Sequence, residues 1–360
     1  MRKRATRDLR ISAEKPLVSP NALRNQLPSD EAIEADVYES RRVIRQILRG
    51  RDDRLIVVVG PCSIHDREAA VDFARKLRRA AGRLAEDLLI VMRVYFEKPR
   101  TVVGWKGLIN DPGLDGSFRI NDGLHLARSI LLDVSRLGLP AANEFLDTVI
   151  GQYFAELVSW GCIGARTVES QVHRQLASGL SMPVGFKNRT DGNVQVAIEA
   201  MRAAGHAHWF PSLTSDGVPA ILATTGNPDT HLVLRGGSDT GPNYHAEAVA
   251  RAAALMRGAG VRPAVMVDCS HANSGKDPAR QPIVARAVAE QVAAGERAII
   301  GVMLESNLKE GRQEFVPGKP LEYGVSITDA CLSWRQTLPV LERLAAAAQE
   351  RRRHHRRRRG

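Results

Sequence analysis

The sequence predicts an α/β fold, a (β/α)8 TIM barrel with an N-terminal extension and an inserted β-hairpin. Two observations carry this prediction: short apolar runs alternate with longer helical patterns, and eight such runs occur. Continuous apolar runs are typical of parallel strands buried on both faces. Eight of them favour a closed barrel, with an open doubly wound sheet as the alternative. The runs are LIVVVG (55–60), LLIVMRV (88–94), AANEFL (141–146), CIGAR (162–166), PVGFK (183–187), HLVLRGG (231–237), AVMVD (264–268) and IIGVML (299–304).

Residues 1–54 precede the first run and form the predicted extension, with a role in subunit contact or regulation. A helix is expected from Ser29 to Leu48, with Ser29 or Asp30 as its cap and Gly50 after its end. Its apolar positions share one face, which must be buried against the body or against a partner subunit. These positions are Ile33, Val37, Val43, Ile44, Ile47 and Leu48.

The predicted catalytic barrel covers residues 55–345, and one segment inside it breaks the strand–helix alternation. Residues 207–225 read AHWFPSLTSDGVPAILATT, in which Ser215-Asp216-Gly217 is a turn sequence between two strand-like halves. We therefore expect a β-hairpin inserted between the fifth and sixth strands. Such an insertion suits assembly or regulation better than chemistry.

The formal net charge of +11 is concentrated at the C-terminus. The last ten residues, RRRHHRRRRG, contain seven arginines, and the rest of the chain carries only +4. A terminal block of like charge is usually a solvated, disordered tail, which predicts disorder for residues 346–360. Because no nucleic-acid-binding motif accompanies the charge, no specific nucleic-acid partner is expected.

The chain carries no sign of a membrane or secreted protein. No run of eighteen uncharged apolar residues occurs, and the basic N-terminus leads into no apolar segment. Cys62, Cys162, Cys269 and Cys331 are far apart and form no CxxC pair. This argues against a disulfide framework or a structural zinc cluster, and predicts a cytoplasmic protein.

Cations gather where the predicted strands end. In a barrel these C-terminal ends form one rim, at which ligands bind. A lone arginine there is usually a surface ion pair, but six cations on one rim would repel one another unless an anionic ligand were bound. Guanidinium groups suit phosphate and carboxylate, and the number of cations indicates more than one phosphate. The six are Arg93, Lys98, Arg100, Arg166, Lys187 and Arg235. The starting ends of the strands show no comparable concentration of charge.

Four ligand-type residues follow strands that are neighbours in a closed barrel: Cys62, His271, Glu305 and Asp329. Singly, Cys62 is more simply a small buried residue and His271 a hydrogen-bonded loop residue. Together they form a sulfur, nitrogen and oxygen set that suits a divalent transition metal: Mn, Fe, Co, Zn or Cu. Such a metal beside clustered cations could polarise an aldehyde carbonyl while the cations hold phosphate groups.

Long motifs of the chain resemble the type I 3-deoxy-D-arabino-heptulosonate 7-phosphate (DAHP) synthases, in the subgroup with an N-terminal extension. The resemblance covers about residues 8–338. It rests on GPCSIHD, RVYFEKPRTVVGWKGLINDP, NEFLD, GARTVESQVHRQLASGLSMPVGFKNRTDG, RGG, DCSHANSGK, GVMLESNLKEG and SITDACLSW. Ordered motifs over such a span are far more specific than one short pattern.

The resemblance implies a metal-dependent, aldol-type condensation of phosphoenolpyruvate with D-erythrose 4-phosphate and water, the first step of the shikimate pathway to aromatic amino acids. It assigns the metal to Cys62, His271, Glu305 and Asp329. It assigns phosphoenolpyruvate to Arg93, Lys98, Arg166, Lys187 and Arg235, and erythrose 4-phosphate to Lys98, Pro99, Arg100 and Thr101. Lys98 is the candidate for proton transfer, with His271 and a metal-bound water as alternatives. A homodimer or homotetramer is also implied.

Members with this extension are commonly inhibited by an aromatic amino acid. By motif position the effector pocket would use Asp8, Gly151, Gln152, Ser181, Phe210, Ser212 and Leu213. The chain departs from the family pattern at Gly151, where a proline is usual, and at Arg7, where an acid is frequent. Asn188-Arg189-Thr190 also replaces Asn-Gly-Thr. The effector therefore stays open, and insensitivity is an alternative.

Three other functions compete with this interpretation. A 3-deoxy-D-manno-octulosonate 8-phosphate synthase has a similar fold and chemistry, but the KPRT run at 98–101 argues against it. A member recruited to a secondary-metabolite pathway would keep the chemistry and change the feedback. A non-catalytic subunit or nucleic-acid binder would use the arginine tail, but the complete set of metal and phosphate residues argues against a dead enzyme.

Overall fold

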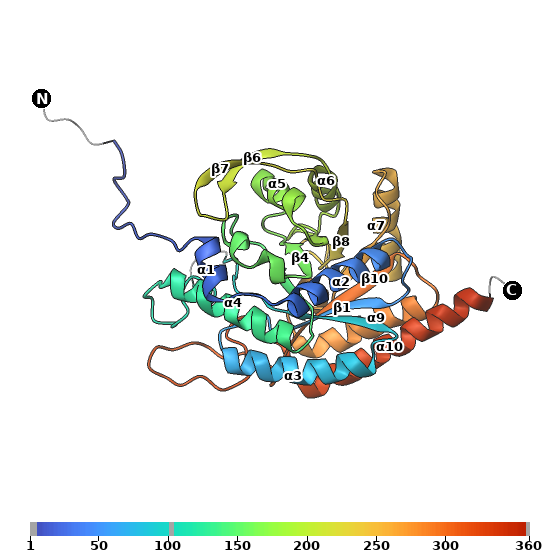
Figure 1. Ribbon diagram of the computed structural model, residues 1–360. Helices are drawn as coiled ribbons and strands as arrows, with labels where there is room; N and C mark the ends of the chain where they lie inside the picture. Colours follow the sequence, from blue (N-terminus) through green and yellow to red (C-terminus); the bar gives the residue numbers. More distant parts are fainter. Residues whose placement is uncertain (1–5, 101–103, 358–360) are drawn as a thin grey trace, which may run out of the picture.

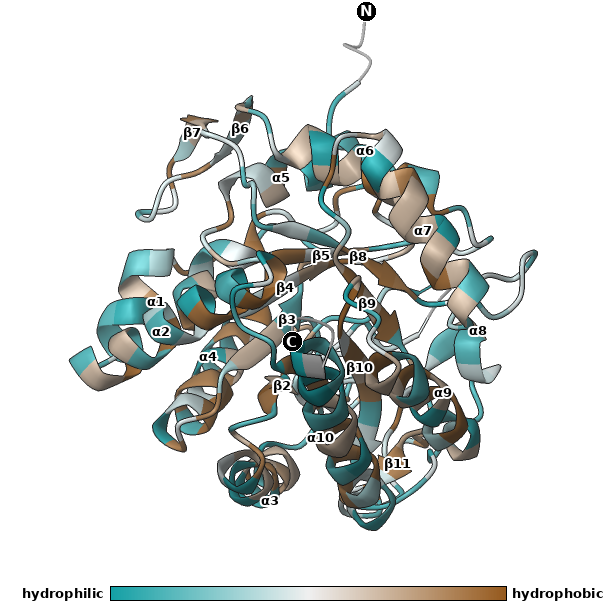
Figure 2. Ribbon diagram, turned by 90° about the vertical axis from the view of Figure 1, so that its right-hand side faces the viewer, coloured by the Kyte–Doolittle hydropathy of each residue, from teal (hydrophilic) through white to brown (hydrophobic). Residues whose placement is uncertain are grey.

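A closed barrel of parallel strands forms the centre of the molecule. The computed structural model describes residues 6–100 and 104–357. Within them, eight strands are hydrogen-bonded in a ring, because the last pairs back onto the first. This closure confirms the predicted barrel over the open sheet, and Figure 2 shows the strands enclosed by helices. In order around the ring they are β1 (Leu55–Gly60), β2 (Leu88–Arg93), β3 (Ala141–Glu144), β4 (Trp160–Ile163), β5 (Val184–Lys187), β8 (Thr230–Leu234), β9 (Val265–Asp268) and β10 (Ile299–Asn307).

Amphipathic helices cover the outside of the barrel. Asp66 shows how one begins, since its carboxylate accepts a hydrogen bond from the backbone N–H of Ala69 at 3.0 Å. The apolar faces of the helices pack on the outward-facing strand residues in one large core. The covering helices are α3 (Arg67–Arg83), α4 (Ile120–Arg136), α5 (Gln171–Gly179), α6 (Gln195–Ala204), α7 (Ala246–Gly258), α9 (Gln281–Ala293) and α10 (Trp334–Arg357). The shorter elements are α8 (His271–Ser274), η1 (Ile150–Tyr153), η2 (Ala155–Leu157), η3 (Pro278–Arg280) and β11 (Leu332–Ser333), which pairs with β10.

The N-terminal extension closes the starting end of the barrel. Helix α2 (Glu31–Leu48) begins at Asp30, whose carboxylate caps the N–H of Ile33 at 2.9 Å. Its residues Ile44, Ile47 and Leu48 join the cluster of side chains that fills the barrel interior. The predicted helix and its apolar face are therefore confirmed, and the face is buried against the body. Helix α1 (Pro20–Gln26) comes before it. Pro16 and Val18 still contact the body through Asn121, and the chain N-terminal to them runs away from the body as an extended segment (Figure 1).

The inserted hairpin forms where it was expected. Strands β6 (Trp209–Leu213) and β7 (Pro219–Ala223) pair antiparallel and belong to a separate two-stranded sheet. The turn between them meets the extension, since the Asn21 amide of α1 donates to Asp216 at 2.6 Å. The two strands of the hairpin are largely exposed to solvent. Trp209 is 75% exposed and Ile221 is 72% exposed.

The C-terminal arginine block is helical through Arg357, so the prediction of a disordered tail over residues 346–360 is wrong for its described part. Arg351 is buried and donates to the carbonyl oxygens of Asp53 at 2.8 Å and Ile299 at 2.9 Å. Arg352 pairs with Asp87 and, at 3.2 Å, with Asp53. The block therefore ties α10 to the starts of β1 and β10. Every helix among the described residues is too short or too polar to cross a membrane.

We expect Arg351→Ala to lower the free energy of unfolding by about 2–4 kcal/mol, because the buried carbonyl oxygen of Ile299 and the partly buried one of Asp53 lose a charged donor. Denaturant unfolding followed by circular dichroism measures this change. Arg353→Ala is the matched control, since Arg353 is exposed and, within residues 6–100 and 104–357, its side chain bonds only to Glu350 of the same helix, at 2.5 Å. Equal stability of the two variants would show that the Arg351 contacts do not hold the helix.

His231, inside the barrel, makes stability depend on pH. Burial lowers the pKa of His231 from 6.5 to about 4, and Trp160 Nε1 donates to its Nε2 at 2.8 Å. Between these values the unfolded chain binds a proton that the folded chain does not, so stability is complete above pH 6.5 and falls as pH drops toward 4. We expect His231→Gln to make the pH dependence shallower by ~1.4 kcal/mol per pH unit in this window. Unfolding curves at pH 4.5, 5.5 and 7 check this, and parallel profiles would contradict it.

Candidate active site

The C-terminal ends of the strands meet around one polar pocket. Of the predicted phosphate-binding residues, Arg93 ends β2, Lys187 ends β5, and Arg166 and Arg235 follow β4 and β8. The pocket is lined by Cys62, Arg93, Tyr95, Glu97, Lys98, Pro99, Glu144, Ala165, Arg166, Lys187, Thr190, Arg235, His271 and Glu305. The barrel thus brings together all five predicted phosphoenolpyruvate residues and three of the four predicted metal ligands.

Two described residues of the predicted site, Asp329 and Arg100, lie apart from this lining. Asp329 lines an adjoining hollow, which it shares with His271 and Glu305. Arg100 is exposed, and its Nε donates to the carbonyl oxygen of Trp105 at 3.0 Å. Thr101 lies outside the described residues.

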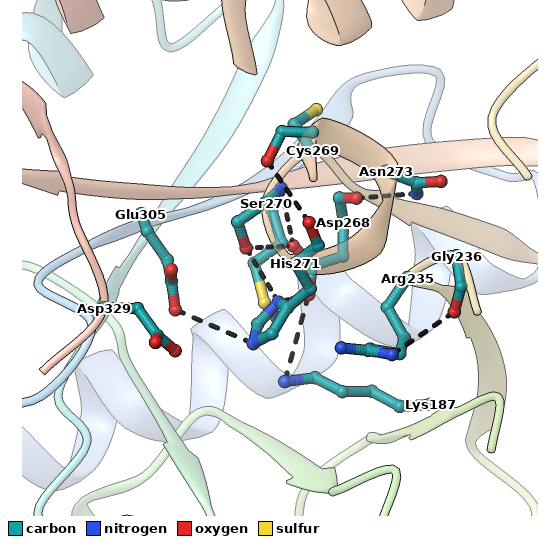
Figure 3. A network of polar contacts seen from close by, with 12 residues as sticks. Lys187, Arg235, Gly236, Asp268, Cys269, Ser270, His271, Asn273, Glu305 and Asp329 are labelled. Carbon is teal, nitrogen blue, oxygen red and sulfur yellow. Dashed lines mark hydrogen bonds and ion pairs between the residues drawn. The ribbon is translucent and has the colours of Figure 1, made fainter. Parts of the chain in front are cut away.

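The predicted metal ligands form a compact group. One ligand atom each of Cys62, Glu305 and Asp329 lies within 4.8 Å of the others. His271 lies at the edge of this group rather than within it: its Nε2 is 3.9 Å from the Glu305 carboxylate (Figure 3). A thiol, an imidazole and two carboxylates fit a divalent transition metal, so the donor set and the spacing agree with such an ion.

Lys98 contacts two of these four side chains. Its Nζ lies 2.8 Å from Cys62 Sγ and 2.9 Å from Asp329 Oδ2. Burial alone would lower the pKa of Lys98, but the neighbouring Cys62 and Glu305 raise it above its ordinary value. The pKa of the Cys62 thiol rises to about 11, through burial and the charge of Glu305. The ammonium therefore stays charged beside the ligand group.

Asp268 orients His271. The imidazole Nδ1 is 2.9 Å from Asp268 Oδ2 and 2.8 Å from Ser270 Oγ, which directs Nε2 toward Glu305 (Figure 3). Burial would raise the pKa of Asp268, yet the charges of His271 and Lys187 hold it far below its usual range. His271 has a φ of +54°, a left-handed conformation that non-glycine residues adopt rarely and often at functional sites.

The deepest cations are paired within the chain. Arg93 is 1% exposed, lies 3.3 Å from Glu305 and covers the ring of Tyr95 at 4.0 Å. Lys187 lies 3.1 Å from Glu144 and 3.9 Å from Asp268. Such pairing is required, because a buried charge without a partner costs several kcal/mol.

Arg166 and Arg235 are different. Within the described residues neither guanidinium has a carboxylate partner within 4.0 Å, and Arg235 bonds only the carbonyl of Gly236, at 3.4 Å. Burial and the nearby charge of Arg166 lower the pKa of Arg235. Two guanidinium groups thus face the same pocket without a counter-charge, which is an arrangement that favours an anionic ligand.

Sequence reasoning missed the acids that support the site. Glu144 and Asp268 are buried at strand ends and neutralise Lys187. Burial, assisted by the charge of Asp147, raises the pKa of Glu97 to about 7, so this pocket residue holds a proton over part of the neutral range. The sequence did offer one indication: Glu144 and Asp268 stand inside the apolar runs at the strand ends, and a carboxylate buried there requires a cation nearby.

Comparison with known proteins agrees with this geometry. The pattern of the DAHP synthetase I family matches residues 26–342. The chain belongs to the DAHP synthetase I family. It is 56% identical to the Phe-sensitive phospho-2-dehydro-3-deoxyheptonate aldolase of Escherichia coli K12, over 94% of this chain and 96% of that one. It is 51% identical to the Tyr-sensitive enzyme of the same strain, over 96% of each chain. The solved structure of the aldolase from Francisella tularensis SCHU S4 superposes with a TM-score of 0.93 at 51% identity, covering 95% of this chain and 99% of that one.

The predicted effector residues are only partly brought together. Gly151 and Gln152 lie in η1, Ser181 follows α5, and Phe210, Ser212 and Leu213 lie on β6. The segment around α1 contacts both η1 and the hairpin, through Tyr153 Oη to the Val18 carbonyl at 2.6 Å and through Asn21. Asp8 is exposed in the extended segment and pairs with its neighbour Arg7 at 2.7 Å. The effector pocket stays a prediction.

We expect Cys62→Ala to abolish stoichiometric binding of a divalent metal and to lower activity by at least ~100-fold, because the sulfur donor is lost. Metal content after dialysis against manganese or zinc, measured by mass spectrometry, checks this without an activity assay. Cys162→Ala, a buried thiol on β4 outside the ligand group, is the control and should keep its metal. Equal metal content in both variants would remove Cys62 from the ligand set.

Proposed function

We propose that this chain is a 3-deoxy-7-phosphoheptulonate (DAHP) synthase, which condenses phosphoenolpyruvate with D-erythrose 4-phosphate and water to give DAHP and phosphate. The observation that carries the proposal is the pair Arg166 and Arg235, two unpaired guanidinium groups beside a Cys, His, Glu and Asp group. The two guanidinium groups suit a substrate with a phosphate and a carboxylate, and the ligand-type group suits an aldehyde that a bound metal would polarise. The names of the relatives at 51–56% identity support the same reaction.

For phosphoenolpyruvate we propose contacts with Arg93, Lys98, Arg166, Lys187 and Arg235. Because Arg93 and Lys187 already face Glu305 and Glu144, most of the charge left for the ligand comes from Arg166 and Arg235. These two would hold the phosphate and carboxylate by paired hydrogen bonds. Arg93 and Lys187 are buried at the bottom of the pocket and would determine how far the ligand enters it.

For erythrose 4-phosphate we propose Lys98, Pro99, Arg100 and Thr101. Lys98 and Pro99 line the pocket, and Arg100 would release the carbonyl of Trp105 to meet the phosphate. This order puts the aldehyde end of the substrate toward Cys62 and the phosphate end toward solvent.

Cys62, His271, Glu305 and Asp329 would hold a divalent metal, for which Mn, Fe, Co, Zn and Cu stay open; when bound, it polarises the aldehyde as a Lewis acid. C3 of phosphoenolpyruvate forms the new bond to the aldehyde carbon, and water adds to C2. The resulting hemiketal phosphate collapses to the ketone and inorganic phosphate. The aldehyde oxygen takes up a proton, for which Lys98 is placed between the two substrates, with His271 as the alternative donor.

We also propose feedback inhibition by an aromatic amino acid at Asp8, Gly151, Gln152, Ser181, Phe210, Ser212 and Leu213. The relatives are named Phe-, Tyr- and Trp-sensitive, so the class of effector is supported better than its identity. The exposed Trp209 and Ile221 of the hairpin support a homodimer or homotetramer in which this segment is covered. Four unpaired cysteines support a reducing location, the cytoplasm.

A phosphate-release assay tests the proposal. We expect phosphate release from phosphoenolpyruvate with erythrose 4-phosphate, at least ~100-fold less with arabinose 5-phosphate, and loss of activity with a chelator that excess metal restores. Higher activity with arabinose 5-phosphate would instead indicate an octulosonate synthase. Repeating the assay with phenylalanine, tyrosine and tryptophan separates a sensitive enzyme from an insensitive one.

A further inference from the structure

A second cavity, of about 630 Å³, opens at the starting end of the barrel, away from the catalytic rim. Its walls are the loop after α2, the residues before β9 and β10, and the last turns of α10. Seven arginines line it: Arg51, Arg54, Arg262, Arg297, Arg351, Arg352 and Arg356. The expectation that the strand starts carry no concentration of charge is therefore wrong. The first four of these arginines lie before three different strands, so the sequence does not show that they are close together. The other three belong to the helical C-terminus, which the sequence predicted to be disordered.

The carboxylates of the cavity do not balance these charges. Asp52 and Asp53 are its acidic lining residues, and they pair with Arg54 at 2.6 Å and Arg352 at 3.2 Å. Within the described residues no carboxylate lies within 4.0 Å of the other five guanidinium groups. These belong to Arg51, Arg262, Arg297, Arg351 and Arg356.

Holding α10 in place explains only part of this cluster. Arg351 serves that purpose through its backbone carbonyl contacts, and Arg297 Nε lies 3.2 Å from His355 Nε2. In the described part of the chain, the guanidinium groups of Arg51, Arg262 and Arg356 make no hydrogen bond or ion pair. Arg262 also lies against Gly50, where a Cβ would come within 2.5 Å of its Nη2, so a glycine leaves room for this guanidinium. Three arginines thus line the cavity without a structural partner.

The chemistry of the lining selects a class of ligand. Guanidinium groups bind phosphate oxygens in pairs, and several of them around one cavity match an anion with more than one phosphate. The apolar lining is Ile47, Ile299 and Ile300, with no Phe, Tyr or Trp ring on which a nucleobase could stack. We propose that this cavity binds a small oligophosphate, a di- or triphosphate group, either free or as the phosphate chain of a nucleotide.

The buried Arg351 supports this assignment. Burial and the charges of Arg352 and Arg297 lower the pKa of Arg351, while Asp53 and Glu296 compensate only in part. An oligophosphate would relieve the mutual repulsion of the cluster. Since attraction between exposed charges is screened by salt, binding should weaken as ionic strength rises.

Calorimetric titration of inorganic tripolyphosphate into the full chain tests the proposal, with saturating phosphoenolpyruvate present to occupy the catalytic pocket. We expect one saturable site per chain, and a Kd raised by about tenfold or more in the double variant Arg51→Gln/Arg262→Gln. The matched control is Arg79→Gln/Arg251→Gln, which removes the same charge from exposed helix positions outside the cavity and should shift the Kd less than about twofold. Equal weakening in the two double variants, or no saturable binding, would overturn the proposal.

Three further ligands refine the test. ATP binding as well as or better than tripolyphosphate supports the nucleotide source, and weaker ATP binding supports the free anion. Orthophosphate binding as tightly as tripolyphosphate would overturn a multivalent site, and so would a single-stranded oligonucleotide that displaces tripolyphosphate at lower concentration. Arg356→Gln, at the exposed end of α10, provides a second variant if the double variant melts early, and it should also weaken binding. Phosphate release at the rim should be unchanged in all of these variants, so the outcome is independent of the proposed synthase activity.

Discussion

Charge pairing at the buried ends of the strands is the constraint on which the catalytic rim depends. Arg93 and Lys187 are buried, and each is stable there because a carboxylate from a strand two positions away in the ring faces it across the end of the barrel. Removing one partner of such a pair typically costs about 3–5 kcal/mol, since the remaining charge is left uncompensated. Among the buried cations of the described rim, Arg93 and Lys187 are therefore occupied by carboxylates, whereas the guanidinium groups of Arg166 and Arg235 face the pocket without a carboxylate within 4.0 Å.

The same constraint links the ligand group to its surroundings. Glu305 faces Arg93, lies near His271 and belongs to the group with Cys62 and Asp329, so one carboxylate has four of these residues around it. Asp268 has a similar double contact with His271 and Lys187. The same carboxylates thus contact both the cations of the pocket and the ligand-type side chains. The distance between these two groups of residues is therefore fixed by Glu305 and Asp268 together.

Much of this arrangement could be predicted from sequence, because parallel strands place their ends at one rim. The apolar runs located the strands, and the neighbourhood of the first, seventh and eighth strands placed Cys62, His271 and Glu305 together. The supporting acids Glu144, Asp268 and Glu97 could not be assigned, since their roles depend on side-chain distances of a few ångströms. The prediction for the C-terminal arginines was wrong for a related reason. A run of like charges is typical of a solvated tail, and the sequence does not show that carbonyl oxygens at the strand starts accept hydrogen bonds from Arg351.

The position of Lys98 bears on how the charge of the ligand-type side chains is balanced in the folded chain. Its ammonium donates to the Cys62 sulfur at 2.8 Å and pairs with the Asp329 carboxylate at 2.9 Å, so the polypeptide itself supplies a cation at this place. A zinc finger needs its ion to fold, because nothing else offsets the charge of its ligands. In this barrel a lysine of the chain itself lies beside the ligand-type side chains, so the charge of the Asp329 carboxylate is already offset within the folded polypeptide.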